Sequence, residues 1–307
     1  MRRRRRRLGF LGALAGAAFV GGLLIGAGND ESADTAGEPE IEDVFAESDR
    51  IFPERRVVAF YGAPQDEALG ALGDGKPGEV ALRLRKQADV YDRPSRPVIP
   101  ALELIATVAN ASPGDNGLYN TQQPDEVIDE YLKLARANGA LLLLDIQPGR
   151  GDFEEEIERL EPYLVQPDVG LALDPEWNVG PDGIPGQVIG SIDADAVNEA
   201  SEYLQGLVEA NDLPQKLLVV HQFTDGMIED KESLLPRPDV AVTLNVDGFG
   251  DPPNKVAKYE ELGPLGSTGT PEELPAGFKL FYEEDTNLMQ PRQVLRLRPQ
   301  PDFVVYE

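Results

Sequence analysis

Eight short, nearly continuous apolar runs recur along the chain, each bounded by proline, glycine or aspartate. Most are four to seven residues long, which is typical of parallel strands buried on both faces of a sheet. Parallel strands need a long crossover between them, so the runs favour an α/β architecture. The runs are residues 57–61, 98–108, 141–146, 169–173, 217–221, 240–246, 278–282 and 303–306.

Helical patterns lie between several of these runs. Residues 125–138 carry an apolar stripe at helical spacing, and Gly139 follows as a stop signal. Asp152 begins a segment that resembles a capping box, and residues 194–210 repeat the helical pattern. Eight strands within residues 52–307 match the usual size of a closed (β/α)8 barrel of the TIM type, about 250 residues. An open doubly wound sheet is the alternative fold, although no Gly-x-Gly-x-x-Gly follows the first run.

The first part of the chain has the pattern of an export signal. Residues 2–7 are all arginine, and residues 8–27 form an uncharged apolar stretch. About 20 apolar residues suffice to span a bilayer as a helix, so we favour a retained signal anchor, with a cleaved signal peptide as the alternative. The basic end stays in the cytoplasm, which places the rest of the chain outside the cell membrane. Residues 28–51 are acidic and poor in large apolar groups, and they predict a disordered linker before a barrel domain at residues 52–307.

Composition narrows the chemistry further. The chain has no cysteine, which excludes a disulfide framework, a thiolate metal site and a cysteine nucleophile. Six of its 28 basic residues form the arginine run, so the remainder carries 22 basic against 55 acidic residues, a formal charge of −33. Such a surface repels nucleic acid and anionic lipid heads but admits sugars, cations and basic partners. The acidic excess is otherwise explained by solubility alone or by a salt-tolerant host.

Polar residues collect where the apolar runs end, and a (β/α)8 barrel builds its active site from these strand ends. Any single residue of this kind is more often a helix cap or a solvated group, whereas convergence from several strands predicts a site. Glu103 lies inside the second run. It is either a buried carboxylate that points inward, or a sign that the strand does not have the bounds assumed here. The strand-end residues are Tyr61, Asp145, Asp174, Glu176, Trp177, His221, Asn245, Asp247, Tyr282 and Glu284.

Alternation of side chains across a strand assigns several of these residues to the barrel interior. Asp174 shares a face with the small residues Gly170 and Ala172, so it is expected to point inward at the mouth, with Glu176 beyond it. The same parity places His221, Asn245 and Asp247 inward. His221 is the only histidine in the chain, and one histidine cannot provide a His-rich metal site. No metal or cofactor is therefore predicted. His221 either lines the predicted site or is a histidine buried in the core.

The segment 172–177, Ala-Leu-Asp-Pro-Glu-Trp, resembles glycoside hydrolase barrels of the chitinase-like and lysozyme-like families, which carry Asp-x-Glu at the end of strand four. Residues 245–248, Asn-Val-Asp-Gly, are similar to the aspartate that chitinase-like proteins have after strand six. The first run is also similar to their first strand. Two departures stand beside the resemblance: small residues replace the longer acidic motif before Asp174, and Asp145-Ile146-Gln147 replaces Ser-x-Gly-Gly on strand three.

The resemblance implies roles for the acidic residues. Glu176 would be the general acid, Asp174 the neighbour that raises its pKa, and Asp247 the stabilising or nucleophilic group. A second pattern, that of retaining glycosidases, pairs a glutamate ending strand four with one ending strand seven, and Glu176 with Glu284 (or Glu283) would fill those places. Trp177 would stack on a sugar ring or pack under the following loop.

Three functions remain in competition at this stage. The first is a cell-surface glycoside hydrolase-like protein that acts on envelope or extracellular polysaccharide. The second is a barrel that binds carbohydrate or an envelope polymer without cleaving it. The third is an exported metal-dependent hydrolase with an all-oxygen carboxylate site. Tyr61, Asp145, His221, Asn245 and Tyr282 are expected to position substrate in the first two. The loops at residues 178–191 and 262–275 are expected to lie over the barrel mouth.

Overall fold

A computed structural model describes residues 45 and 48–307 of the protein, and within them eight parallel strands close into a barrel. Strand β1 (Arg56–Gly62) pairs with β11 (Phe303–Tyr306) on one side and with β2 (Val98–Ala109) on the other, which closes the sheet. This pairing confirms the predicted barrel and excludes the open doubly wound sheet. The other barrel strands are β4 (Leu141–Ile146), β5 (Val169–Leu173), β7 (Lys216–Gln222), β9 (Val240–Val246) and β10 (Ala276–Leu280).

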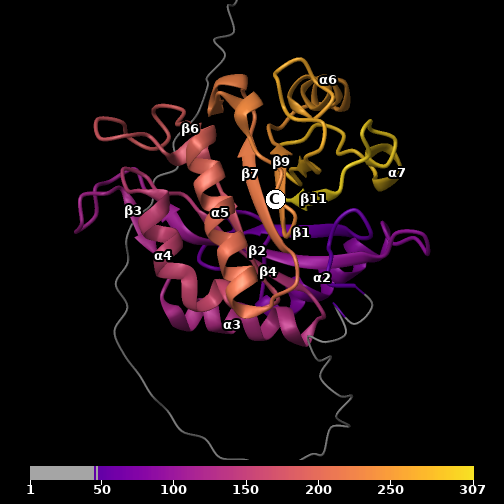
Figure 1. Ribbon diagram of the computed structural model, residues 1–307, viewed down its shortest axis with the longest axis horizontal. Helices are drawn as coiled ribbons and strands as arrows, with labels where there is room; N and C mark the ends of the chain where they lie inside the picture. Colours follow the sequence, from indigo (N-terminus) through magenta and orange to yellow (C-terminus); the bar gives the residue numbers. More distant parts are fainter. Residues whose placement is uncertain (1–44, 46–47) are drawn as a thin grey trace, which may run out of the picture. The chain divides into compact units, whose positions relative to one another are not determined.

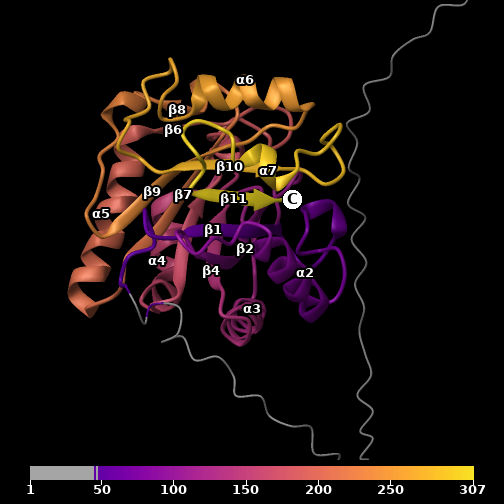
Figure 2. The same cartoon turned by 90° about the vertical axis from the view of Figure 1, so that its right-hand side faces the viewer.

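Helices cover the outer surface of the barrel, as an α/β alternation requires. Figure 1 shows α3, α4 and α5 beside the strands, and Figure 2 shows α2, α3, α5 and α6 placed around them. The Asp152 side chain accepts the backbone N–H of Glu154 and caps α4, as its sequence pattern predicts. The helices are α2 (Pro77–Asp89), α3 (Asp125–Ala137), α4 (Phe153–Leu164), α5 (Ala194–Asn211), α6 (Pro252–Leu262) and α7 (Pro291–Val294).

The loops between the barrel strands contain short strands and 3₁₀ helices. Strand β3 (Asn120–Gln122) extends the sheet antiparallel to β2, and β6 (Ile192–Asp193) pairs with β8 (Ile228–Glu229). Four short 3₁₀ helices in the described part of the chain are Glu67–Leu69, Pro175–Trp177, Asp225–Met227 and Lys231–Ser233.

Two apolar layers follow from the alternation of side chains along the strands. The inner layer fills the barrel and includes Ala59, Ala101, Leu143, Ala172 and Val219. The outer layer packs under the helices and includes Val58, Leu102, Leu144, Leu171 and Val220. Leu171 and Leu173 thus face the helices while Ala172 faces the interior, as predicted. The inward positions are mostly small or branched, which is what a filled barrel interior accommodates.

Gly277 in β10 illustrates how tightly this interior is filled. A Cβ atom there would lie 2.8 Å from both Cα and Oδ1 of Asn245. We expect Gly277→Ala to destabilise the protein by about 1–3 kcal/mol, the usual cost of forcing extra volume into a packed core. Gly206→Ala in α5 is the matched control, because a Cβ there meets nothing within 4 Å, and it should stabilise by about 0.5–1 kcal/mol. Urea denaturation of both variants measures the difference; equal effects would contradict the tight fit.

Two predictions were wrong: the position of one loop and the end of one strand. The loop that follows α6 was expected over the barrel mouth, but its residues Pro264, Leu265 and Leu274 line a cavity of about 360 Å³ together with Gln215 and Val240. Those last two residues stand at the starts of β7 and β9, so this loop lies at the opposite end of the barrel. The strand predicted to reach residue 282 also ends earlier, at Leu280.

The predicted export segment at residues 8–27 and most of the predicted linker lie outside the described residues. Where the chain is described before β1, it already packs on the barrel: Ile51 and Phe52 are buried, and their N–H groups donate to Gln215 Oε1 at 2.9 and 3.0 Å. Within residues 45 and 48–307, no helix is both long enough and apolar enough to cross a bilayer.

Candidate active site

Ionisable and polar side chains meet inside the barrel at the carboxyl ends of its strands. Each strand contributes at least one of them, because inward positions that are apolar lower in the barrel become polar toward the mouth. All but Glu307 are less than a tenth exposed. The members of this mouth cluster are Tyr61, Glu103, Asp145, Asp174, His221, Asn245, Asp247, Lys279 and Glu307.

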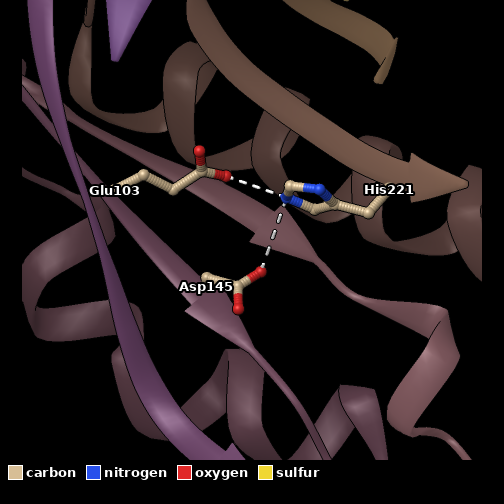
Figure 3. Close-up of side chains that lie close together, drawn as sticks. All are labelled: Glu103, Asp145 and His221. Carbon is tan, nitrogen blue, oxygen red and sulfur yellow. Dashed lines mark hydrogen bonds and ion pairs between the residues drawn. The ribbon is translucent and has the colours of Figure 1, made fainter. Parts of the chain in front are cut away.

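His221 stands at the centre of the mouth cluster and is fully buried. Its Nε2 lies 2.9 Å from Glu103 Oε1, and its Nδ1 lies 2.9 Å from Asp247 Oδ2. Asn245 holds the other oxygen of Asp247 through its Nδ2 group. Burial lowers the pKa of His221, but Asp247 and Glu103 outweigh that effect and raise the pKa well above its usual value. Figure 3 shows Glu103 and Asp145 directed at the same ring nitrogen.

Lys279 supplies the second positive charge of the mouth cluster. Its Nζ lies 2.7 Å from Glu307 Oε2, 3.5 Å from Asp247 Oδ2, and 3.7 Å from the centre of the Tyr61 ring. Burial opposes its charge, but Asp247 and Glu307 raise the pKa of Lys279 well above its usual value. Lys279 and His221 together outweigh burial at Asp247 and lower the pKa of that carboxyl. Asp247 is therefore ionised at neutral pH.

Asp174 is held by two hydrogen-bond donors at the rim. Trp177 Nε1 donates to Asp174 Oδ2 at 3.0 Å, and the Tyr61 hydroxyl lies 3.3 Å from the same oxygen. That hydroxyl also lies 3.3 Å from Asp145 Oδ2 and accepts from Gln147 Nε2 at 2.8 Å. Burial, then the charge of Asp174, raises the pKa of Asp145 well above its usual value. Trp177 thus orients a carboxylate in addition to offering a half-buried ring.

Glu176 lies beyond Asp174 in the 3₁₀ helix Pro175–Trp177 and is partly exposed. Burial raises its pKa, and the charges of Asp174 and Asp247 raise it further, so that the pKa is about 8. Lys279 lowers it and Glu307 raises it by smaller amounts. Glu176 consequently keeps its proton at neutral pH while Asp247 has lost its own. Two carboxyl groups whose environments push their pKa values apart are suited to act as acid and base.

The structure does not bring two of the predicted residues into this cluster. Glu284 is exposed, and Tyr282 is 42% exposed with its ring stacked on Tyr306 at 5.2 Å, on the helix side of the barrel. The chain turns away after β10 because Asp285 folds back to accept the N–H groups of Phe281 and Gly250. Both predicted residues line a cavity of about 160 Å³ in which Glu307 is the only member of the mouth cluster among the lining residues described.

Sequence reasoning left out two members of the cluster and left a third undecided. Lys279 was not considered, Glu307 was noted only as the polar residue after the last run and given no role, and Glu103 was left between an inward carboxylate and a register error. The structure places Glu103 inward, opposite Tyr61 in the register of β1 and β2. The available signal was the same for Glu103 and Lys279: an ionisable residue in the middle of an apolar run, at inward parity. Such a residue is buried only with charged or polar partners.

Comparison with known proteins adds no family to this geometry. No protein-family profile matches the chain, and no curated protein sequence matches it either. Of the resemblance to glycoside hydrolases, the structure shows the barrel, and no matching sequence supports the family.

Proposed function

We propose that the chain is an exported barrel hydrolase that cleaves glycosidic bonds by carboxylate acid–base chemistry, with Glu176 as the general acid. The proposal rests on the place of Glu176: it is a partly exposed glutamate at the barrel mouth, next to Asp174, and burial together with the charges of Asp174 and Asp247 raises its pKa to about 8. Protonation of the leaving oxygen requires an acid that still holds its proton near neutral pH. In glycoside cleavage, one proton from such an acid is enough to let the leaving sugar depart as an alcohol.

The second group needed by such a reaction is an ionised carboxylate that stabilises the cation-like sugar centre. Asp247 fits this role, because Lys279 lies 3.5 Å away and His221 Nδ1 lies 2.9 Å away. Asp174 is a positioning residue, whose charge raises the pKa of the acid and whose own place is set by Trp177 and Tyr61. Glu284, the alternative by resemblance, is exposed on the turn after β10.

The charge of the mouth favours a neutral or amino-sugar polymer as substrate. Six carboxyl groups (Glu103, Asp145, Asp174, Glu176, Asp247 and Glu307) accompany only two basic side chains, His221 and Lys279, among the residues described, so carboxylates remain in excess even with Glu176 protonated and the pKa of Asp145 raised. Such a field repels phosphates and uronic acids. The arginine run and apolar stretch at residues 2–27 support export, which would place the barrel next to envelope or extracellular polysaccharide.

The test is hydrolysis of a panel of neutral, amino-sugar and uronic-acid polysaccharides by the full-length protein from pH 4 to pH 10. The release of reducing ends measures the rate. We expect cleavage within the first two groups, and kcat/KM should fall as the pH rises through about 8, because Glu176 then loses the proton it must donate. The groups that set this limb are Asp174, Asp247, Lys279 and Glu307.

Two other outcomes would replace the proposal. Binding of a polysaccharide without cleavage at any pH would identify a carbohydrate-binding barrel. Cleavage that increases through pH 7 and stops on addition of a chelator would indicate a metal-bound hydroxide as the nucleophile.

A further inference from the structure

A second site lies deeper in the barrel, below the groups assigned to the reaction. Glu103, Asp145 and His221 each direct one ligand-type atom into the same space, and these atoms all lie within 4.8 Å of one another. Nε2 of His221 is 2.9 Å from Glu103 Oε1 and 3.9 Å from Asp145 Oδ1. All three side chains are fully buried, and Figure 3 shows both carboxylates directed at that nitrogen.

Two oxygens of these carboxylates have no partner among the described residues: Asp145 Oδ1, which faces His221 Nε2, and Glu103 Oε2, which points away from the ring (Figure 3). Within residues 45 and 48–307, neither Glu103 Oε2 nor Asp145 Oδ1 accepts a hydrogen bond. A buried carboxylate oxygen without a partner is costly, so each one calls for an ion or an unseen donor. A proton on His221 Nε2 would satisfy Glu103 Oε1 alone, because Asp145 Oδ1 at 3.9 Å is beyond hydrogen-bond range. A cation between the three side chains would be bound by Glu103 Oε1 and Asp145 Oδ1 at once, and it would give Asp145 Oδ1 the partner it lacks.

The opposite side of the imidazole ring is already arranged for a metal ligand. Nδ1 faces Asp247 Oδ2 at 2.9 Å, and Asn245 and Lys279 hold that carboxylate in place. The ion would take the place of the proton that His221 otherwise carries on Nε2, while Nδ1 keeps its proton for Asp247. A histidine that donates its Nδ1–H to a carboxylate in this way presents the Nε2 lone pair to a metal, which is the usual arrangement around a histidine ligand. This hydrogen bond is independent of the three proposed ligand atoms.

We propose that Glu103, Asp145 and His221 Nε2 bind one divalent transition ion, of the class of Zn²⁺ or Mn²⁺. Such ions bind nitrogen and oxygen at about 2.0–2.2 Å, so adjacent ligand atoms stand roughly 3–3.5 Å apart. The 2.9 Å separation is slightly short of this range and the 3.9 Å separation slightly beyond it, so small rotations of Glu103 and Asp145 would bring both atoms to the ligand spacing. The imidazole ligand favours these ions over Ca²⁺ and Mg²⁺, which prefer oxygen. The ion would join β2, β4 and β7, which carry its three ligands, and its role is to fix the floor of the mouth.

The decisive experiment follows the single histidine of the chain. Full-length protein made without an affinity tag and labelled with ¹⁵N-histidine is stripped with a chelator and titrated with ZnCl₂. We expect one equivalent to bind, with the ¹⁵N signal of Nε2 moving to a metal-bound position while Nδ1 stays protonated. MgCl₂ should leave both signals unchanged. An unchanged Nε2 signal at stoichiometric zinc, or equal responses to zinc and magnesium, would overturn the proposal.

Variants then test the carboxylates by isothermal titration calorimetry. Glu103→Gln and Asp145→Asn should each weaken zinc binding at least 10-fold, and Asp247→Asn should weaken it about 10–100-fold, as loss of a partner of a histidine ligand usually does. Glu130→Gln, on the exposed face of α3, is the control and should bind as the wild type does. Circular dichroism checks that each variant is folded. Equal affinity in the Glu103, Asp145 and Glu130 variants would refute the site, and the wild-type histidine signal decides the matter if a variant does not fold.

Discussion

Glu176→Gln should reduce the rate of polysaccharide hydrolysis about 10²–10⁴-fold, the usual cost of removing a general acid. Glutamine keeps the size of the side chain but has no proton of suitable acidity to give to the leaving oxygen. The substitution should also remove the fall of kcat/KM near pH 8, because that limb reports the ionisation of Glu176. Initial rates across the pH range, measured on the polysaccharide that the wild type cleaves fastest, give both results.

A stability measurement separates a catalytic Glu176 from a structural one. The folded pKa of about 8 lies above the ordinary value of 4.5, so the folded state retains a proton that the unfolded chain releases between these pH values. The wild type therefore loses stability as the pH rises from about 4.5 to 8, and Glu176→Gln should be the more stable protein at pH 9. Glu130→Gln, which is exposed on α3, should change neither rate nor stability. Loss of stability in Glu176→Gln at pH 9 would assign the carboxylate a structural role.

The barrel and much of its mouth could be predicted because both depend on alternation along a strand. Runs buried on both faces determine that the sheet is parallel and covered by helices, and parity then decides which side chains face inward. Asp174, His221 and Asn245 were placed inward by this rule alone, and the structure places them so, beside Tyr61 and Asp145.

The missing part of the site depends on contacts that no local pattern contains. Lys279 lies in an apolar strand, and its charge is compensated only because β9 and β11 place Asp247 and Glu307 beside it. Glu103 likewise gains its partner His221 from a position 118 residues away. The end of β10 was predicted two residues too late, because hydrophobicity continues through Phe281 and Tyr282 while the turn is made by the Asp285 side chain.

The charges of the mouth form one connected network instead of separate pairs. His221 links Glu103 to Asp247, and Lys279 links Asp247 to Glu307. Each cation is shared by two carboxylates, so loss of one cation leaves two buried or partly buried negative charges without compensation. Burial raises the pKa values of Asp145, Asp174 and Glu176, whereas the two shared cations lower that of Asp247. Lys279, which contacts Asp247 and Glu307, is therefore expected to be important for the stability of the cluster.

Lys279→Met should destabilise the protein by about 3–5 kcal/mol, which is the usual cost of removing one partner of a buried ion pair. Methionine matches the length of the lysine stem, so the loss reports charge and not volume. Chemical denaturation of the full-length protein measures the effect. Lys133→Met, at an exposed position of α3, is the matched control and should change stability by no more than about 0.5 kcal/mol.

A double-mutant cycle shows whether the loss comes from the ion pair itself. Glu307→Gln removes the carboxylate that lies 2.7 Å from Lys279 Nζ, so Lys279→Met together with Glu307→Gln should cost less than the two single changes added together. The expected coupling is about 0.5–3 kcal/mol, the range found for residues in direct contact. Strict additivity would mean that Lys279 does not stabilise Glu307. A cost for Lys279→Met no larger than that for Lys133→Met would mean that protons or another cation neutralise the mouth, and the network as described would be wrong.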